Sequence, residues 1–272
     1  MKLLQTSLYF IVLYLTSYSM LPPVLAQSYP TKTTWQVSQK FQPSVDNQRH
    51  PETIGAGTRF KPPVDDQTNP ETRGAGTRGS SCFLPKQVIT SLLPANQSGL
   101  TLNKHPTFFW HIPQTSVKTA EFAIITDGNK RDGEETVVYE TTLSLPQQSG
   151  IISLTLPKKV EALKTNTNYR WYFTIICDDE DSSNNPYVEG LVKRIPAQLK
   201  LSTSLSNANL LQMANLYAQA GIWHDALTSL VKLRCNQPNN PKVKLHWQQF
   251  LDSVKLNNIV SEPLLNYCTI KN

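Results

Sequence analysis

Short apolar runs bounded by turn residues fill the chain between Cys82 and about residue 200. In the sixth run Tyr169, Trp171 and Phe173 fall on one face, because strand side chains alternate with a period of two. Seven such runs predict an antiparallel β-sandwich over residues 82–200, with a break from Pro94 to Leu100. The predicted strands are residues 87–93, 107–112, 120–126, 136–143, 150–156, 168–177 and 187–195.

After the seventh run the apolar period changes to about 3.6, which is typical of amphipathic helices. We expect a first helix to begin near a cap at Ser206 or Asn207 and to end at Gly221. A second and a third helix follow, and a short fourth one is expected from Ser261. The first two helices look like one tetratricopeptide unit. Because one unit cannot bury both of its faces, it should lie against the third helix or the sandwich, within a helical module of residues 204–272.

The entry to the sixth strand, Leu163-x-x-x-Thr167-x-Tyr169, resembles the tyrosine corner of fibronectin-type and immunoglobulin-like sandwiches. In that arrangement the phenol hydroxyl bonds to backbone upstream. No cysteine lies in the second run, so the immunoglobulin inter-sheet disulfide is absent and the fibronectin-like comparison is the better one. The predicted fold class is therefore mainly β with α: a fibronectin- or immunoglobulin-like sandwich of seven strands, followed by a small tetratricopeptide-like helical module.

Residues 1–26 have the layout of a signal peptide. Lys2 precedes an apolar run over residues 8–15, Pro22 and Pro23 stop a helix, and the sequence VLA ends at Ala26. We predict cleavage after Ala26 and a periplasmic or secreted protein. The alternative is an uncleaved segment that anchors the chain in a membrane.

Residues 27–81 are polar, rich in proline and poor in aliphatic side chains, which predicts a disordered leader. Within it, residues 41–59 match residues 60–78 at 13 of 19 positions. Each copy ends in Gly-Ala-Gly-Thr-Arg, but neither has the preceding strand and following helix that a phosphate-binding loop requires. The alternative to a disordered leader is a docking peptide that folds onto a partner.

Three sequence blocks resemble a family of secreted cyanobacterial proteins that is catalogued only as a domain of unknown function. The blocks are GAGTRGSSC at 74–82, TLNKHPTFFWHIP at 101–113 and RWYFTIICDDEDSSNNPYVEG at 170–190. The helical segment GIWHDALTSLVKLR at 221–234 fits the same family, so the resemblance runs from about residue 74 to the end. The extra leader copy at 41–59 departs from the family pattern. The resemblance implies export and a sandwich followed by helices, and it carries over no catalytic residue.

Four cysteines in an exported chain predict two disulfides, and none of them forms a C-x-x-C pair suited to zinc or thiol redox chemistry. Cys82 precedes the first strand and Cys177 closes the sixth. In an up-and-down count of seven antiparallel strands these two positions reach the same end of the sandwich. Cys235 and Cys268 are then each other's nearest candidates in the helical module.

The acidic loop that begins at Asp178 is the best candidate for a ligand site. Asp179, Asp181, Ser183 and Asn185 alternate oxygen ligands as calcium loops do, but the glycine and glutamate of an EF-hand are missing. A solvated turn explains the same composition, so calcium is the minority interpretation. No cofactor is expected.

Charge and motif content narrow the function to two classes. The 26 lysines and arginines and 20 aspartates and glutamates are dispersed, which argues against a nucleic-acid-binding face. Neither His-Glu-x-x-His nor Gly-x-Ser-x-Gly occurs, and His105 is expected to be structural. We therefore predict a non-enzymatic binding or assembly module whose partner is an envelope protein or surface component. The alternative is a hydrolase whose site is assembled from scattered residues.

Overall fold

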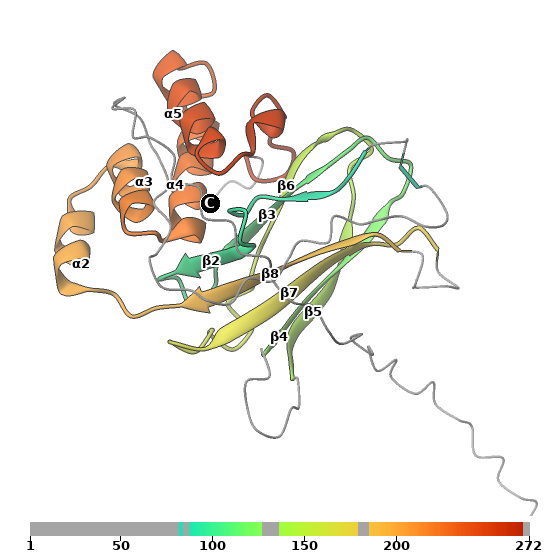
Figure 1. Ribbon diagram of the computed structural model, residues 1–272, viewed down its shortest axis with the longest axis horizontal. Coiled ribbons are helices and arrows are strands. Elements are labelled where there is room, and N and C mark those ends of the chain that lie inside the picture. Colours follow the sequence, from blue (N-terminus) through green and yellow to red (C-terminus); the bar gives the residue numbers. More distant parts are fainter. Residues whose placement is uncertain (1–81, 84–86, 127–135, 179–184, 269–272) are drawn as a thin grey trace, which may run out of the picture. The chain divides into compact units, whose positions relative to one another are not determined.

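The computed structural model describes residues 82–83, 87–126, 136–178 and 185–268, all within one compact unit of the chain, residues 43–272. The predicted signal segment, the duplicated leader and most of the acidic loop lie outside the described residues. The described part is rich in β-structure and carries four α-helices after its last strand (Figure 1).

Among the described residues, eight strands form two sheets. The smaller sheet has the order β1-β3-β6 and the larger one has the order β2-β8-β7-β4-β5. All neighbouring strands are antiparallel except β2 and β8, which run parallel. The strands are β1 Thr90–Ser91, β2 Ser98–Thr101, β3 Thr107–Ile112, β4 Thr119–Thr126, β5 Val137–Ser144, β6 Gly150–Thr155, β7 Asn168–Ile175 and β8 Tyr187–Arg194.

The prediction of seven strands was wrong by one, because β2 lies where a break was expected. This strand has only four residues, one of them Gly99, so it lacks the β-branched run that marks a strand in sequence. The strand forms because Ser98 to Thr101 pair with Leu191 to Arg194 of β8. The other seven predicted runs each contain one strand.

Aromatic side chains join the facing surfaces of the two sheets. In β7, buried residues alternate with half-buried ones, which confirms the predicted face of Tyr169, Trp171 and Phe173. The ring of Phe173 stacks on Trp110 of β3 with centroids 4.4 Å apart. Both side chains are completely buried, so the core lies between the sheets.

Tyr169 forms the predicted bond at the corner that leads into β7. Its hydroxyl accepts a hydrogen bond from the backbone N–H of Lys164 at 2.8 Å. The carbonyl of Leu163 accepts another from the guanidinium of Arg194 at 2.9 Å. The two contacts fix the loop before β7 against β7 itself and against the end of β8.

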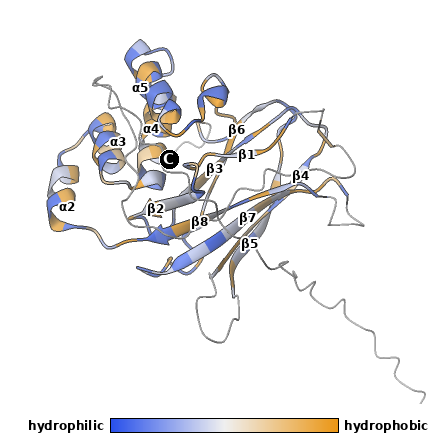
Figure 2. Ribbon diagram, in the orientation of Figure 1, coloured by the Kyte–Doolittle hydropathy of each residue, from blue (hydrophilic) through white to orange (hydrophobic). Residues whose placement is uncertain are grey.

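The helices are α2 Leu199–Ser206, α3 Leu210–Gln219, α4 Trp223–Asn236 and α5 Pro241–Asp252, with a 3₁₀ turn η2 at Asn257–Ile259. Each of α3, α4 and α5 carries both hydrophobic and hydrophilic residues (Figure 2), as the helical period predicted. The expected boundary near residue 200 falls inside α2, which was not predicted because it buries none of its residues.

The ends of α3 follow from its sequence. Asn209, rather than Ser206 or Asn207, is the N-cap, and it forms a capping box with Gln212. Gly221 ends the helix as predicted, with a φ of 72° that glycine adopts at little cost. The N–H groups of Gly221 and Ile222 return to the carbonyls of Ala218 and Tyr217, which satisfies the last turn.

The expected fourth helix from Ser261 was wrong. Residues 262–268, which we call the C-terminal segment, instead run beside the edge strand β6, and Leu264 forms a parallel bridge with Ile151. Backbone hydrogen bonds join Ile151 N to Pro263 O at 2.7 Å and Leu265 N to Ile151 O at 2.9 Å. A strand edge that offers free N–H and C=O groups competes with helix formation in this segment.

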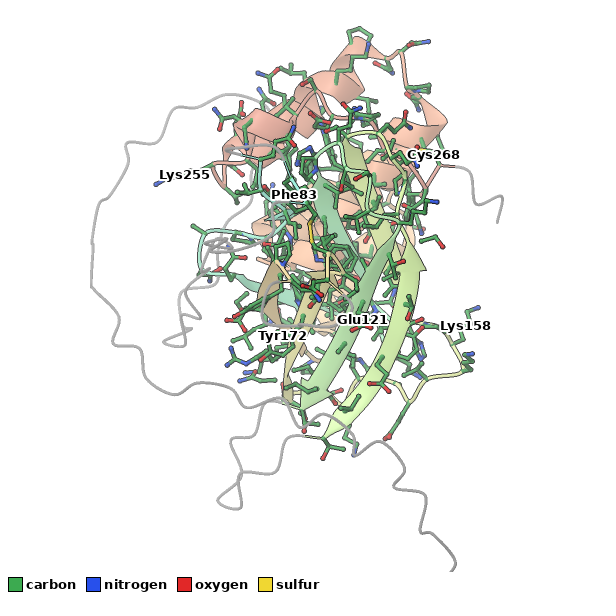
Figure 3. The ribbon with its side chains drawn as sticks, turned by 90° about the vertical axis from the view of Figure 1, so that its right-hand side faces the viewer. Phe83, Glu121, Lys158, Tyr172, Lys255 and Cys268 are labelled. Atoms are coloured by element: carbon green, nitrogen blue, oxygen red, sulfur yellow. A yellow bond between two sulfur atoms is a disulfide. The ribbon has the colours of Figure 1, made fainter. Side chains whose placement is uncertain are left out.

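Both predicted disulfides are confirmed. Cys82 bonds to Cys177 and Cys235 bonds to Cys268, with Cα–Cα distances of 5.7 and 5.2 Å. The first connects the start of the sandwich to the end of β7. The second connects the end of α4 to the C-terminal segment, and Cys268 lies beside the helices (Figure 3).

Candidate functional site

A cavity of about 130 Å³ lies where helix α4 meets the sandwich. Thr101, Asn103 and Thr107 line it from β2, β3 and their connection. Tyr217 of α3 and Asp225 of α4 line it from the other side. The cavity thus brings titratable side chains of the two helices next to polar residues of the sandwich that lie more than 100 residues earlier in the sequence.

Asp225 anchors the start of α4 to the end of β2. Its Oδ2 atom accepts hydrogen bonds from Thr101 Oγ1 at 2.7 Å and from the backbone N–H of Leu102 at 3.0 Å. Burial raises the pKa of Asp225, while these hydrogen bonds and the charge of Lys232 oppose the rise. Because Asp225 lies in the first turn of α4, its carboxylate also interacts favourably with the helix dipole.

Tyr217 shares the electrostatic environment of Asp225. Burial, and then the charge of Asp225, raise the pKa of the Tyr217 phenol above its usual value. The phenol is therefore protonated at neutral pH and can act only as a neutral hydrogen-bonding group.

His224 is buried directly beside this cavity. Its Nδ1 lies 3.2 Å from the carbonyl oxygen of Thr107, so Nδ1 carries the hydrogen and Nε2 has the lone pair. Burial lowers the pKa of His224 to about 4, which keeps the ring neutral at physiological pH. Nε2 has no hydrogen-bond partner in the described structure.

The His224 ring packs against Gly99 of β2, where no side chain is in its way. A Cβ atom at residue 99 would lie 2.6 Å from His224 Nε2 and 2.7 Å from Cδ2, closer than such atoms approach. The free nitrogen therefore faces the backbone of β2, and no space remains on that side for a reacting atom. His224 is a packed part of the joint between helix and sheet.

Asp225 and His224 both take part in the joint between α4 and the sandwich. Oδ2 of Asp225 already accepts two hydrogen bonds. The Thr101 hydroxyl donates one of them and is fully buried. We use the name α4 junction for Leu92, Thr101, Leu102 and Thr107 together with Trp223, His224 and Asp225.

A second hollow, of about 580 Å³, lies beside α5 and η2. Gln248 and Asp252 of α5 line one side, and Lys255, Asn257 and Ser261 line the other. The described lining holds neither histidine nor cysteine.

A serine, a histidine and a glutamate meet at the C-terminal segment. Ser149 Oγ donates to Glu262 Oε2 at 2.9 Å and lies 3.1 Å from His111 Nε2. His111 Nε2 lies 3.4 Å from the same carboxylate oxygen. Burial lowers the pKa of His111, and the charge of Glu262 and its hydrogen bond oppose that change.

This cluster does not have the geometry of a catalytic triad. In a triad the serine bonds to one ring nitrogen and the acid orients the other. Here Ser149 and Glu262 share Nε2 of His111, and the serine hydroxyl is directed at the carboxylate. The cluster instead ties β3 and the loop before β6 to the residue that begins the C-terminal segment.

Asn185, at the end of the acidic loop, forms hydrogen bonds to the residues at its beginning. Its Oδ1 accepts from the backbone N–H groups of Cys177 and Asp178, and its Nδ2 donates to the Asp178 carbonyl. These bonds are those of a turn-closing amide. Asp179, Asp181 and Ser183 lie outside the described residues, so the calcium interpretation stays a prediction.

The structure also bears on the role of His105, on metal binding and on membrane-spanning helices. His105 is structural as predicted, with Nε2 2.9 Å from the carbonyl of Val160. No group of three histidine, cysteine or acidic side chains is placed to hold a metal ion in the part of the chain that the structure describes. Over the same part, no helix is long and apolar enough to cross a membrane.

The sequence did not reveal the α4 junction. His224 and Asp225 stand next to each other in a helical segment, but their partners Thr107 and Thr101 lie 117 and 124 residues away. A polar pair in the first turn of the helix, directly after Trp223, was the available signal. It does not identify a partner.

No curated protein matches this sequence. The family model described as Domain of Unknown Function (DUF928) matches residues 73–264. The matched range contains all three resembling blocks, at 74–82, 101–113 and 170–190, and most of the helical part. It confirms the family resemblance, while a cyanobacterial source and export stay predictions. The chain therefore belongs to the DUF928 family, a domain of unknown function.

Proposed function

We propose that this chain is an exported, non-enzymatic binding or assembly module of the periplasm or cell envelope. One observation supports this most. The side chains that resemble catalytic groups, His224 and Asp225 on one side and His111 and Glu262 on the other, are occupied in joining the helical part to the sandwich. A scaffold of this kind offers surfaces to a partner, such as an envelope protein or surface component.

Export is proposed from the signal-like segment 1–26, with cleavage after Ala26. The two disulfides are consistent with an oxidising compartment. N-terminal sequencing of the native protein should give a chain that begins at Gln27. Recovery of Met1 in a membrane pellet would contradict this and favour an anchored chain.

The finer fold assignment is also a proposal. The orders β1-β3-β6 and β8-β7-β4-β5 correspond to the two sheets of a fibronectin-like sandwich, with β2 added beside the last strand. The Tyr169 hydroxyl bond supports the same assignment. The pair α3 and α4, connected through Gly221, supports a tetratricopeptide-like unit that packs on the sandwich and on α5.

Affinity capture from envelope fractions of the native organism tests the binding function. The oxidised chain that begins at Gln27 should retain a defined component, and the same chain without residues 27–81 shows whether the leader takes part. A reduced and unfolded sample is the control for nonspecific capture. If the folded chain retains nothing beyond that control, the proposal of a binding module fails.

A hydrolase is the second candidate, because His111, Ser149 and Glu262 bring together the residue types of a serine hydrolase, although not in the geometry of a triad. Ester and peptide substrate panels test this possibility, with Ser149→Ala as the variant. Thr115→Ala, at a buried hydroxyl that donates to the carbonyl of Cys82, is a matched control. Turnover that disappears only with Ser149→Ala would favour the hydrolase over the binding module.

A further inference from the structure

We propose that two copies of this chain associate through β5, whose free edge pairs antiparallel with β5 of the second copy. β5 is the last strand of the five-stranded sheet and has eight residues. None of the described residues pairs with its outer edge. Self-association of this kind is separate from the envelope partner proposed above.

The other three sheet edges are short or covered. β1 has two residues and β2 has four. The C-terminal segment covers β6 through backbone bonds to Ile151, and the side chain of Asn266 bonds to the backbone of Ser153. Proteins protect edges in this way because free N–H and C=O groups attract another strand.

β5 lacks the features that discourage pairing. Its sequence VVYETTLS contains neither lysine nor proline, and Glu140 is its single charge. The one irregularity is a bulge opposite Ile124 and Ile125, at the beginning of the strand. Among the residues that the structure describes, no strand pairs with the outer edge of the regular part from Tyr139 to Ser144.

The hydrogen-bond alternation of β5 determines which residues would bond. The N–H of Leu145 donates to Lys118 O, so this position faces β4. Neighbouring residues of a strand direct their N–H and C=O groups to opposite edges. Glu140, Thr142 and Ser144 therefore present theirs to the free edge.

One two-fold register lets these backbone groups pair and also keeps like charges from facing each other. With the axis at Thr141, Glu140 exchanges backbone hydrogen bonds with Thr142 of the second copy. On the core side, Tyr139 then faces Leu143 of the second copy, which extends the half-buried apolar border of the sheet. An axis at Glu140 would instead place the two carboxylates directly opposite each other, which is unfavourable.

The expected affinity is modest. Pairing one strand edge buries less than the roughly 1,200 Å² at which stable interfaces begin, so association should depend strongly on concentration. The two Glu140 side chains lie diagonally across the axis, about 7–8 Å apart in such pairs. Glu140→Gln should therefore tighten the dimer.

Sedimentation of the full chain tests the proposal. The chain is produced by export, so that both disulfides form, and it is measured at about 1 µM to 1 mM, the concentration range of weak association. Thr142→Pro removes an N–H that faces the free edge and should weaken dimerisation by about tenfold or more. The control Thr142→Ala keeps that N–H and should change the dissociation constant less than about threefold. A chain that is monomeric throughout, or a dimer unaffected by Thr142→Pro, would overturn the proposal.

Cysteine cross-linking tests the register without a helix- or strand-breaking residue. Thr141→Cys should form an intermolecular disulfide under mild oxidation, because residue 141 faces its own copy across the axis. Thr142→Cys should cross-link far more slowly, since residue 142 faces Glu140. Both variants must retain the two native disulfides. Cross-linking only through Thr142→Cys would refute the register, and none with either variant would refute pairing through β5.

Discussion

The helical part is attached to the sandwich at two places, and the two attachments are built differently. At the α4 junction the contacts are buried and involve side chains: Trp223 is completely buried, stacks on Phe250 and donates its indole N–H to the carbonyl of Leu92 at 2.8 Å. At β6, the C-terminal segment adds backbone hydrogen bonds to a sheet edge, and its side chains are half-buried or exposed.

The difference shows what each attachment depends on. The α4 junction depends on packing, because the ring of His224 fits only where residue 99 has no side chain. The C-terminal segment depends on covalent restraint, because a strand of a few residues at an edge pairs weakly and the Cys235–Cys268 disulfide keeps it close. A change in packing should therefore affect the first attachment more, and reduction should affect the second more.

The largest effect is expected from Trp223→Ala. The change removes a completely buried ring and its hydrogen bond, so the free energy of unfolding should fall by about 3–5 kcal/mol. Tyr267→Ala at the other attachment removes a half-buried ring that packs on Phe109 and should cost about 1 kcal/mol. Chemical denaturation of the oxidised variants measures both, and equal costs would contradict the difference between the attachments.

Removal of the second disulfide should have the next largest effect. The double variant Cys235→Ser, Cys268→Ser opens a loop of 33 residues, for which chain entropy predicts a loss of about 3–4 kcal/mol. Hydrogen exchange should accelerate at the amides of Ile151 and Leu265, which bond across β6 and the C-terminal segment. Amides of the α4 junction, such as Leu102, serve as the internal control and should stay protected.

Matched glycine substitutions compare the two attachments directly. An alanine Cβ at residue 99 would meet the buried His224 ring, whereas one at residue 150 would meet the side chain of Leu265 in the C-terminal segment. Because the half-buried leucine can move and the ring cannot, Gly99→Ala should cost about 1–3 kcal/mol and Gly150→Ala less.

A double-mutant cycle identifies why Gly99→Ala lowers the free energy of unfolding. Addition of His224→Ala to Gly99→Ala should cost clearly less than the sum of the single changes, since the clash disappears with the ring. Strict additivity in denaturation experiments would show that the close approach between residue 99 and His224 is not what destabilises Gly99→Ala.

Much of the sandwich was predictable because its information is local. The alternation of Tyr169, Trp171 and Phe173 revealed the buried face of β7. The pairing of Cys82 with Cys177 was also predicted correctly, although the count of seven strands behind it missed β2. β2 escaped prediction because its four residues become a strand only beside β8. The same holds for the C-terminal segment, whose extended form depends on the free edge of β6.

The candidate site was less predictable than the fold. His224 acquires its neutral state from burial against Gly99 and Thr107, and both partners lie on strands far away in sequence. Asp225 likewise gains its role from Thr101 and Leu102. A single sequence shows residue types and local periods, but these roles arise from contacts between distant segments.

The smallest predicted effect concerns pH and the α4 junction. His224 takes up a proton near pH 6.5 in the unfolded chain, whereas burial lowers the pKa of the folded residue to about 4. Between these values the unfolded state binds more protons, so the stability present above pH 6.5 is lost as the pH falls. From pH 7 to pH 5.5 the contribution of His224 should amount to about 1 kcal/mol.

His224→Asn isolates this contribution, because the asparagine amide can still donate to Thr107 and does not titrate. The raised pKa of Asp225 acts in the opposite direction, and the lowered pKa of His111 and of His246 acts in the same direction, but all three persist in the variant. The difference in the free energy of unfolding between wild type and variant should therefore shrink by about 1 kcal/mol from pH 7 to pH 5.5. His111→Gln should remove less of the pH dependence of stability than His224→Asn does. The reason is that Glu262, at the C-terminal segment, partly compensates the effect of burial on the pKa of His111. If the two histidine variants change the pH dependence equally, the α4 junction is no more tightly packed around its histidine than the attachment at β6.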